Sequence, residues 1–460
     1  MTTAFAHASE TPFWSSTLEP GPVCPSLDRD LTCDLVIIGG GFTGLWSALK
    51  ARERFADARI VLVDAKACGQ DASSRNGGFC APSISHGIGN ALARWPREAE
   101  TLIRLGRNNL DELACDLGTY GIGADFQRSG KLTVAATPWQ AEGLRAMSSN
   151  YERFGIEHQL LSGDALREKL DSAVYGEGLF EPNYALVNPV RLVAGLQNAC
   201  LDAGIEIFEH TPVMGIHHDR SGLVLETPSG TVFSDKAILA TNAARPMLRR
   251  LRASIIPIFD YSLVTQPLSE AQLAGIGWTG NYGVGDSGNQ FHYARKTADN
   301  RILWAGYDAI YHYGSKRDPK LLQREESFAL LAQQFAECFP SLADVRFDFK
   351  WGGIIDTSAR TTFFSGLAYG GRLAYALGFT GQGVSATRFA ALTMLDLLEG
   401  RRTERTELRM IRRMPVPFPP EPFRSLAIGM AQKGLAREDA TGRRSPFLRL
   451  LDAFGVGFDS

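Results

Sequence analysis

The chain of 460 residues is long enough for two or three domains with sizeable hydrophobic cores. Hydrophobic residues make up 44% of it and charged residues 21%, as in ordinary soluble globular proteins. The formal net charge is −2 with acidic and basic residues intermixed, and the lack of a basic stripe argues against a nucleic-acid partner.

Cysteine usage and the length of the apolar runs argue against two further classes. The seven cysteines are scattered and none forms a C-x-x-C pair, which favours reduced thiols in a cytoplasmic protein over a disulfide framework or a zinc site. No metal site is therefore predicted. The uncharged run 35–49 has 15 residues interrupted by glycines, so it is too short to span a membrane.

The first segments of the chain are an arm and a strand–glycine–helix–strand pattern. Residues 1–30 contain several prolines and little periodicity, so we predict an irregular arm that Phe13 and Trp14 anchor. A β-branched run at 35–38 predicts a strand buried on both faces, and the spacing G-x-G-x-x-G follows it. A helix is expected from Leu45, and a second buried strand at 60–63.

This order of elements predicts adenine-dinucleotide binding. The glycines allow a tight turn, close approach of a pyrophosphate and close packing of helix on strand, while the helix N-terminus favours the phosphates. Asp64 follows the second strand, where its carboxylate suits ribose hydroxyls and disfavours the 2′-phosphate of NADP. The alternative is a glycine-rich turn in an ordinary α/β unit. The predicted contacts are Gly39, Gly41, Phe42, Thr43, Gly44 and Asp64.

A polar, glycine-rich segment at 65–82 comes next. It is too polar for a core element, so it is either a surface loop or a loop that folds over the phosphates and ring of a cofactor. Its position directly after Asp64 favours the cofactor loop. The predicted contacts in it are Ser73, Ser74, Arg75, Asn76, Gly77 and Gly78.

The middle of the chain alternates between helical and strand-like patterns. Helices are predicted at 91–118, 138–154, 189–203 and 320–339. Strands are predicted at 124–136, 173–185, 205–208, 213–217, 222–226 and 237–240, with a turn at 218–221. A β-rich region spans 254–314 and contains a predicted hairpin turn at 298–300, and a strand and loop follow at 351–365.

A second glycine loop lies near the other end of the chain. A strand predicted at 373–377 leads into the segment 378–383, and an apolar helix follows from Val384. This loop therefore precedes a helix N-terminus, as the first one does. Prolines cluster at 415–422, and residues 423–460 are expected to pack on the surface as a tail.

Together these motifs resemble the D-amino-acid oxidase superfamily of FAD enzymes, which includes glycine oxidase and the sarcosine oxidases. The matching segments are IIGGGFTGLWSA with Asp64, ASSRNGGF, ILATNA and GFTGQGVS. The SSRNGG loop and the arm are most similar to the gamma-glutamylputrescine oxidases within that superfamily. The resemblance extends over about residues 10–400.

The resemblance implies an α/β (α+β) fold, with a Rossmann-like FAD-binding domain and a second, β-sheet substrate domain. The implied limits are 1–30 for the arm, 31–123, 186–252 and 350–400 for the FAD-binding domain, 124–185 and 253–349 for the substrate domain, and 401–460 for a C-terminal tail. The resemblance adds Val213 as a backbone contact to adenine, and at the pyrimidine end of the flavin it adds Gly378, Thr380, Gly381, Gln382 and Gly383. Sarcosine-oxidase-type enzymes attach FAD to a cysteine near there, and none follows Cys338, so FAD is expected to bind non-covalently.

Two departures from the superfamily pattern favour an amine substrate. Amino-acid oxidases of this superfamily hold the substrate carboxylate with an arginine, and the matching segment 354–357 contains none. Sarcosine oxidases carry a lysine after the last glycine loop, where this chain has Val384 and Ser385. An amine is therefore expected in preference to a small amino acid held by its carboxylate.

The strand expected at 290–296 carries the candidate catalytic residues. Alternation places Tyr293 and Arg295 on one face and His292 and Lys296 on the other, and one face should look toward the flavin. His292 would take a proton from the amine, and the charge of Lys296 would assist oxygen activation. The alternatives are surface positions for these two and a structural role for Arg295. The candidate substrate-binding residues, aromatic side chains that contact a cationic amine or else belong to a core, are Tyr293, Trp304, Tyr307 and Trp351.

The predicted activity is that of an FAD-dependent amine oxidase. A hydride passes from the carbon next to the amine nitrogen to the flavin, the imine hydrolyses to a carbonyl compound, and oxygen is reduced to hydrogen peroxide. Three alternatives stay open: a dehydrogenase of the same fold that passes electrons to a quinone or an electron-transfer protein, an oxidase of glycine, sarcosine or D-amino acids, and a structural flavoprotein without catalysis.

Overall fold

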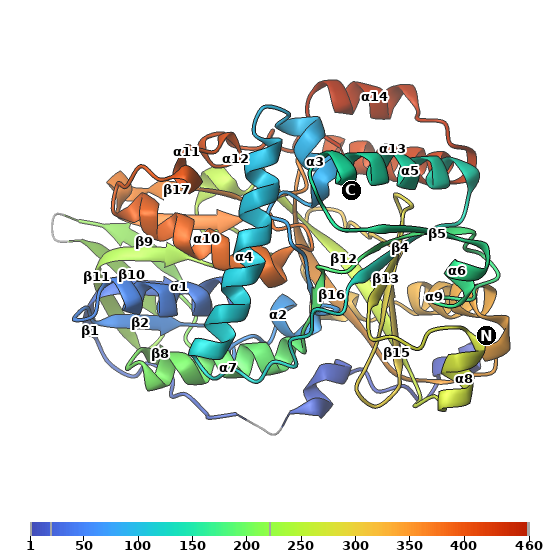
Figure 1. Ribbon diagram of the computed structural model, residues 1–460. Helices are drawn as coiled ribbons and strands as arrows, with labels where there is room; N and C mark the ends of the chain where they lie inside the picture. Colours follow the sequence, from blue (N-terminus) through green and yellow to red (C-terminus); the bar gives the residue numbers. More distant parts are fainter. Residues whose placement is uncertain (1, 19–20, 220–221, 458–460) are drawn as a thin grey trace.

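Two eight-stranded β-sheets form the framework of the computed structural model, which describes residues 2–18, 21–219 and 222–457 (Figure 1). A short two-stranded sheet, β3 (Phe79–Cys80) with β7 (Ala185–Leu186), lies apart from them. The predicted arm, the predicted turn at 218–221 and the predicted tail each include residues outside the described part of the chain. No helix within the described ranges is long and apolar enough to cross a membrane.

Five parallel strands in the order β18, β11, β1, β2, β8 make up the centre of the first sheet. The register places Ile37 of β1 beside Leu62 of β2 and Ile238 of β11. Helices and loops cover both faces, and Val36 and Ile37 are 0% exposed, which explains the continuous apolar run. The bounds are β1 Leu31–Ile38, β2 Ile60–Val63, β8 Glu206–Phe208, β9 Gly215–His218, β10 Leu223–Thr227, β11 Gly230–Leu239, β17 Phe364–Ala368 and β18 Leu373–Leu377.

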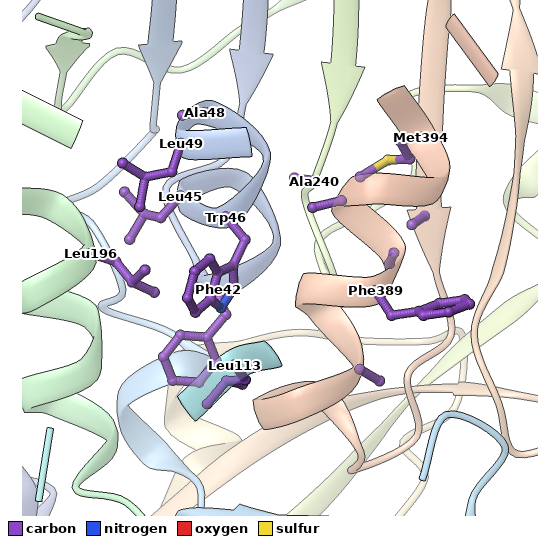
Figure 2. Packing of buried hydrophobic residues seen from close by; sticks show 14 of the residues in the cluster. Phe42, Leu45, Trp46, Ala48, Leu49, Leu113, Leu196, Ala240, Phe389 and Met394 are labelled. Atoms are coloured by element: carbon purple, nitrogen blue, oxygen red, sulfur yellow. The ribbon is translucent and has the colours of Figure 1, made fainter. Parts of the chain in front are cut away.

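Helices α1 (Phe42–Arg54), α4 (Ala99–Thr119), α7 (Pro189–Asp202) and α10 (Gly383–Leu398) surround the main core of this half. Figure 2 shows Leu45 and Trp46 of α1 near Leu196 of α7 and Leu113 of α4. Helix α1 also packs against α10, and Arg54 Nη1 lies 2.8 Å from Asp396 Oδ1 of that helix. The two helices that follow the glycine loops are thereby fixed against each other.

The second sheet is mixed and has the strand order β16, β12, β15, β14, β13, β4, β6, β5. Its β14 and β15 form the predicted hairpin, with Ala294 opposite Trp304. Helix α9 (Glu325–Cys338) packs on one face, and the other face lines a cavity. The bounds are β4 Lys131–Ala135, β5 Gln159–Ser162, β6 Glu177–Glu181, β12 Ile255–Thr265, β13 Gly283–Asp286, β14 His292–Lys296, β15 Ile302–Gly306 and β16 Phe347–Ser358.

The remaining helices complete the described chain. The α-helices are α2 Ala72–Arg75, α3 Gly87–Arg94, α5 Pro138–Arg153, α6 Gly163–Arg167, α8 Glu270–Gly275, α11 Glu404–Glu407, α12 Arg409–Arg412, α13 Phe423–Thr441 and α14 Pro446–Ala453. The 3-10 helices are η1 Thr2–Phe5, η2 Phe13–Thr17, η3 Arg249–Leu251, η4 Pro319–Leu322, η5 Pro340–Leu342 and η6 Tyr369–Gly371.

The fold class predicted from the sequence is confirmed, and the element limits differ in places. The helix expected at 91–118 is two helices, α3 and α4, with Pro96 in the break, where a residue without a backbone N–H does not continue a helix. The strand expected at 124–136 is limited to β4. The second sheet keeps β16 as far as Ser358, so a domain limit at residue 350 falls inside a strand.

The C-terminal region differs most from expectation. We expected a surface tail, and instead α13 and α14 form a pair of helices beside α3 and α5 (Figure 1). Several of their side chains line the same cavity as the second sheet. The sequence pattern does not indicate which side of α13 is buried, because this helix carries apolar residues on more than one side, among them Leu426 and Leu435.

Candidate active site

One cavity of about 770 Å³ lies where the two sheets meet. Its walls are the N-termini of α1 and α10, the loop 72–79, one face of the second sheet and the C-terminal helices. This volume is in the range of small-molecule and cofactor sites. Among the described residues no group of histidine, cysteine, aspartate and glutamate side chains has the arrangement of a metal site.

The first glycine loop has two glycines that the chain itself requires and one that it does not. Gly39 has φ +110°, and a Cβ on it would meet the carbonyl of Ala240. A Cβ on Gly44 would overlap the carbonyl of Gly39. A Cβ on Gly41 would meet only the Ser73 hydroxyl, at 2.9 Å. The space in front of Gly41 is thus open to the cavity, as a pyrophosphate site requires.

Asp64 lies beside this loop at the end of β2. Its Oδ2 accepts a hydrogen bond from Gly40 N at 2.6 Å, and its Oδ1 accepts one from Lys66 N at 2.7 Å. Burial raises the pKa of this carboxyl, and the two backbone donors oppose that effect. Thr211 N donates to Asp64 O at 2.7 Å, so the segment leading to Val213 is adjacent, as an adenosine site at this end requires.

Two buried tryptophan side chains donate hydrogen bonds to backbone carbonyls of the loop 72–78. Trp14 Nε1 donates to Asn76 O at 2.8 Å, and Trp351 Nε1 donates to Arg75 O at 3.0 Å. The Ser73 hydroxyl accepts a hydrogen bond from Phe42 N at the start of α1, at 3.0 Å. The arm and β16 therefore fix a polar loop against the first glycine loop, and most residues of this loop line the cavity.

A buried carboxylate, Asp356 of β16, shapes the second glycine loop. It accepts hydrogen bonds from Gly378 N and from Phe379 N, the latter at 3.1 Å. Burial raises the pKa of Asp356 to about 7. Beyond this turn, Gln382 Oε1 and Thr387 Oγ1 are buried, line the cavity and have no hydrogen-bond partner in the described structure. Such atoms fit the polar edge of a bound cofactor.

Alternate residues of the second sheet face the cavity, as the two-residue period of a strand requires. On β12 these are Ile258, Asp260 and Ser262, on β14 Tyr293, and on β4 Lys131 and Thr133. The ring of Tyr293 lies against the loop 72–78, because a Cβ on Gly77 would be 2.8 Å from Tyr293 Cε2.

Asp260 is the most distinctive group on this face. Its Oδ2 accepts a hydrogen bond from the Tyr293 hydroxyl at 2.7 Å, and it lies opposite Gly353 in the register of β12 and β16. Burial raises the pKa of Asp260 to about 6, with hydrogen bonds from Tyr293 and backbone N–H groups opposing the rise. It is therefore a carboxylate near neutral pH, directed into a largely apolar cavity.

His292 and Lys296, the expected catalytic residues, do not line the cavity. His292 stacks on Trp304 with ring centroids 4.5 Å apart, and its two ring nitrogens contact Asp286 Oδ2 and Gln334 Oε1. Lys296 Nζ donates to Thr279 O at 2.9 Å. Both belong to the face that packs on α9, so the expected roles at the flavin have no geometric support. The predicted alternation along β14 is confirmed, and it is the face with Tyr293, opposite to His292 and Lys296, that lines the cavity.

The four expected substrate-binding residues divide in the same way. Tyr293 and Tyr307 line the cavity, whereas Trp304 packs on Phe335 and Trp351 supports the loop 72–78 from outside it. Arg295 has the structural role that was the alternative: its Nη1 donates to Val187 O at 2.6 Å, and burial lowers its pKa to about 10.

Of the expected cofactor contacts, most meet at the cavity. Those that line it are Gly41, Phe42, Thr43, Ser73, Arg75, Asn76, Gly77, Gly78, Thr380, Gly381, Gln382 and Gly383. Gly39, Gly44, Ser74 and Gly378 lie just behind these, while Asp64 and Val213 lie at the β2 end of the first loop. Sequence reasoning missed Asp260 and Asp356; the available signal for Asp260 was a single acid inside the apolar run 255–264.

Comparisons with known proteins agree with this site. Residues 34–397 match the DAO family, described as FAD dependent oxidoreductase. Gamma-glutamylputrescine oxidoreductase from Escherichia coli (strain K12) is 30% identical over 380 residues, which is 82% of this chain and 85% of that protein. A probable oxidoreductase, OrdL, from Haemophilus influenzae is 28% identical over 384 residues, 82% of this chain and 85% of its own.

The fold itself recurs in solved structures. The crystal structure of glycine oxidase from Geobacillus kaustophilus superposes with a TM-score of 0.68 at 21% sequence identity, over 81% of this chain and 96% of that one. The residues present fit FAD: the N-terminus of α1 and an unobstructed Gly41 suit the pyrophosphate, and the N-terminus of α10 with the unpartnered Gln382 and Thr387 atoms suits the ring. FAD is accordingly the cofactor, and its non-covalent attachment stays a prediction.

The open space at Gly41 leads to a direct test. Gly41→Val should fold and lose most of its FAD, because the branched side chain occupies the pyrophosphate position while meeting only the Ser73 hydroxyl of the chain. Flavin absorbance per protein after gel filtration measures the loss, expected to be about tenfold or more. Gly143→Val is the control, because Gly143 is an exposed residue of α5 outside the cavity lining and a Cβ there meets nothing within 4 Å. Full FAD content in Gly41→Val would show that the pyrophosphate binds elsewhere.

Proposed function

Because the chain belongs to the DAO family of FAD-dependent oxidoreductases, we propose that it oxidises the carbon–nitrogen bond of an amine without a carboxylate on the reacting carbon. FAD, when bound, accepts a hydride from that carbon and passes both electrons to oxygen, which becomes hydrogen peroxide. The substrate becomes an imine, and water hydrolyses it to a carbonyl compound and ammonia or an amine. The name of the Escherichia coli relative, which specifies an amine conjugate, supports this class.

The observation that carries the proposal is the carboxylate of Asp260 on the cavity face. The charged neighbour that raises its pKa further is a second carboxylate, Asp308. Asp308 is neutralised by its pairing with Arg324, so the Asp260 carboxylate is the group that favours a cation beside it in a cavity with apolar walls, and a protonated amine is the complementary ligand. Tyr293 holds the Asp260 carboxylate in place through its hydroxyl, 2.7 Å away.

Among the described residues, three cationic side chains line the cavity, those of Arg75, Arg107 and Lys131, and the charge of Arg107 acts on Glu181. Ile354 lines the cavity at the position where the superfamily pattern has an arginine. The guanidinium of Arg75 also lines it, but its Nη1 donates to Gly352 O at 3.0 Å. Lys131 lies on the distant strand β4, where the charges of Glu181 and Asp286 offset its own.

The chain's residues then have separable tasks. Asp260 binds the ammonium group and accepts its proton as the neutral amine forms, which is the form that releases a hydride. Tyr307 and the apolar side chains of Ile258 and Ile354 exclude water from the reacting carbon. The N-terminus of α10 stabilises negative charge at the pyrimidine end of the flavin.

Anaerobic stopped-flow reduction of the bound FAD tests the proposed function. Amines without an α-carboxylate should bleach the flavin faster than glycine, sarcosine or D-alanine, and admitting oxygen should yield one hydrogen peroxide per amine oxidised. Fast bleaching by D-alanine or sarcosine with no response to any amine would contradict the substrate class. A reduced enzyme that reacts with a quinone and not with oxygen would instead identify the dehydrogenase alternative.

Asp260→Asn separates substrate binding from cofactor binding. We expect kcat/KM for an amine to fall by about 100-fold or more, because a desolvated ammonium loses its counter-charge. FAD content should stay unchanged. The matched control is Asp308→Asn, since the carboxylate of Asp308 is already paired with Arg324 at 3.1 Å, and the loss there should be several times smaller. Equal losses of kcat/KM in the two variants would contradict the assignment of Asp260 as the group that binds the ammonium.

The raised pKa of Asp260 sets a pH dependence. Benzyltrimethylammonium does not titrate, so any change in its affinity comes from the protein. Its Kd, measured by calorimetry with the holoenzyme at constant ionic strength, should fall as pH rises through about 6, because Asp260 gains its charge there. Asp260→Asn should bind weakly with no such change. An equal rise in affinity in Asp260→Asn would assign the titration to another group.

A further inference from the structure

The C-terminal helices are tied across the opening of the cavity. At the second sheet, Asp439 accepts hydrogen bonds from Asn289 N and Gln290 N, each at 2.8 Å. Glu421, just before α13, accepts one from the Tyr311 hydroxyl at 2.6 Å. On the other side, Arg94 of α3 donates to Gly457 O at 2.8 Å. Helices α13 and α14 therefore span from the substrate sheet to the FAD-binding half (Figure 1).

The side of α13 that faces the cavity is mostly apolar, and its polar residue Gln432 donates a hydrogen bond to Ala309 O. Ala427, Ile428, Ala431 and Leu435 recur at helical spacing and line the cavity, and Phe447 and Leu451 of α14 continue the surface. Leu426 points the other way and is 62% exposed. Apolar side chains that border an open cavity gain contacts when an apolar ligand fills it.

Another wall of the cavity is mostly apolar as well. Ile88 of α3, Ile103 of α4 and Met147 of α5 line the same cavity, while Arg107 and Tyr151 of these helices interact with Glu181. The part of the cavity that these residues and the C-terminal helices line is continuous with the part that contains Asp260. The C-terminal helices lie beyond residue 397, where the match to the family ends, so the family relationship assigns them no role.

We propose that α13 and α14 enclose an apolar subsite for the distal part of the substrate, so that the preferred amine carries an aliphatic or aromatic group remote from the oxidised carbon. The inference rests on the proposed function in placing the amine at Asp260. Lys131 and Glu181 line the sheet side of the cavity, where Glu181 also accepts a hydrogen bond from Tyr151 at 3.0 Å. The apolar group consequently follows α13, away from these charges.

Binding of alkyltrimethylammonium ions to the FAD-loaded enzyme tests the subsite without requiring turnover. The probes are the butyl, hexyl and octyl compounds, and the readout is Kd by calorimetry. Each added methylene should tighten binding about three- to fourfold if it leaves water for an apolar wall. Among oxidisable n-alkylamines, kcat/KM should rise with chain length in parallel.

Variants on the two sides of α13 provide the control. Ile428→Ser should flatten the dependence on chain length, whereas Leu426→Ser, on the exposed side of the same helix, should leave it unchanged. Ala427→Phe should bind the butyl probe normally and the octyl probe poorly, because the ring fills the subsite. Ala427→Phe removes no buried contact, so it tests the subsite even if Ile428→Ser fails to fold.

The outcomes separate this inference from the proposed function. Chain-length-dependent binding with no oxidation of any amine would contradict the function and keep the subsite. Wild-type affinity that does not change from butyl to octyl would overturn the subsite, whatever the enzyme oxidises. Preference for 6-aminohexanoate over hexylamine would also overturn it, and would move the distal group to the cationic Lys131.

Discussion

The packing of α1 on α10 is the constraint on which the rest of the site depends. The two helices follow glycine loops from opposite ends of the family region, and the ion pair between Arg54 and Asp396, 2.8 Å apart and with the Asp396 carboxylate 0% exposed, joins their far ends. Their N-termini consequently open into one cavity. A dinucleotide needs this convergence, because one terminus serves its phosphates and the other the ring.

The two faces of the second sheet explain which of its residues line the cavity. Side chains alternate along each strand, so a residue's face decides whether it contacts α9 or the cavity. His292 and Trp304 stack on the α9 side, and Asp260 and Tyr293 form their hydrogen bond on the cavity side. The proposed function rests on this placement, because Asp260 is a carboxylate on the cavity side where a substrate cation would be received.

Local patterns predicted most of the FAD-binding half. Short-range geometry requires a glycine at the tight turn (Gly39), a glycine where the helix packs on the strand (Gly44) and an acid at the end of the second strand (Asp64). The spacing of the sequence shows each of these positions. The alternation of side chains in 290–296 was also visible. Which face lines the cavity, however, depends on the packing of α9 against the other face, and local patterns do not show a contact between segments so far apart in the sequence. Pattern alone therefore predicted His292 and Lys296 and did not identify Asp260.

The C-terminal helices were beyond prediction for a related reason. Whether Ile428 borders a cavity or solvent is decided by Asn289, Tyr311 and Arg94, which hold the ends of α13 and α14 from segments more than a hundred residues away. Helix α13 has apolar side chains on two sides, so its periodicity marked no single buried face.

The central claim is that Asp260 receives the substrate's ammonium group. The most direct measurement is a crystal structure of the anaerobically reduced, FAD-loaded enzyme with n-octylamine bound, a state in which no further hydride can be accepted. The account predicts the nitrogen within hydrogen-bond distance of the Asp260 carboxylate and the alkyl chain along α13. A nitrogen bound at Glu181 or Asp286, with Asp260 keeping only its hydrogen bonds from Tyr293 and from backbone N–H groups, would contradict it.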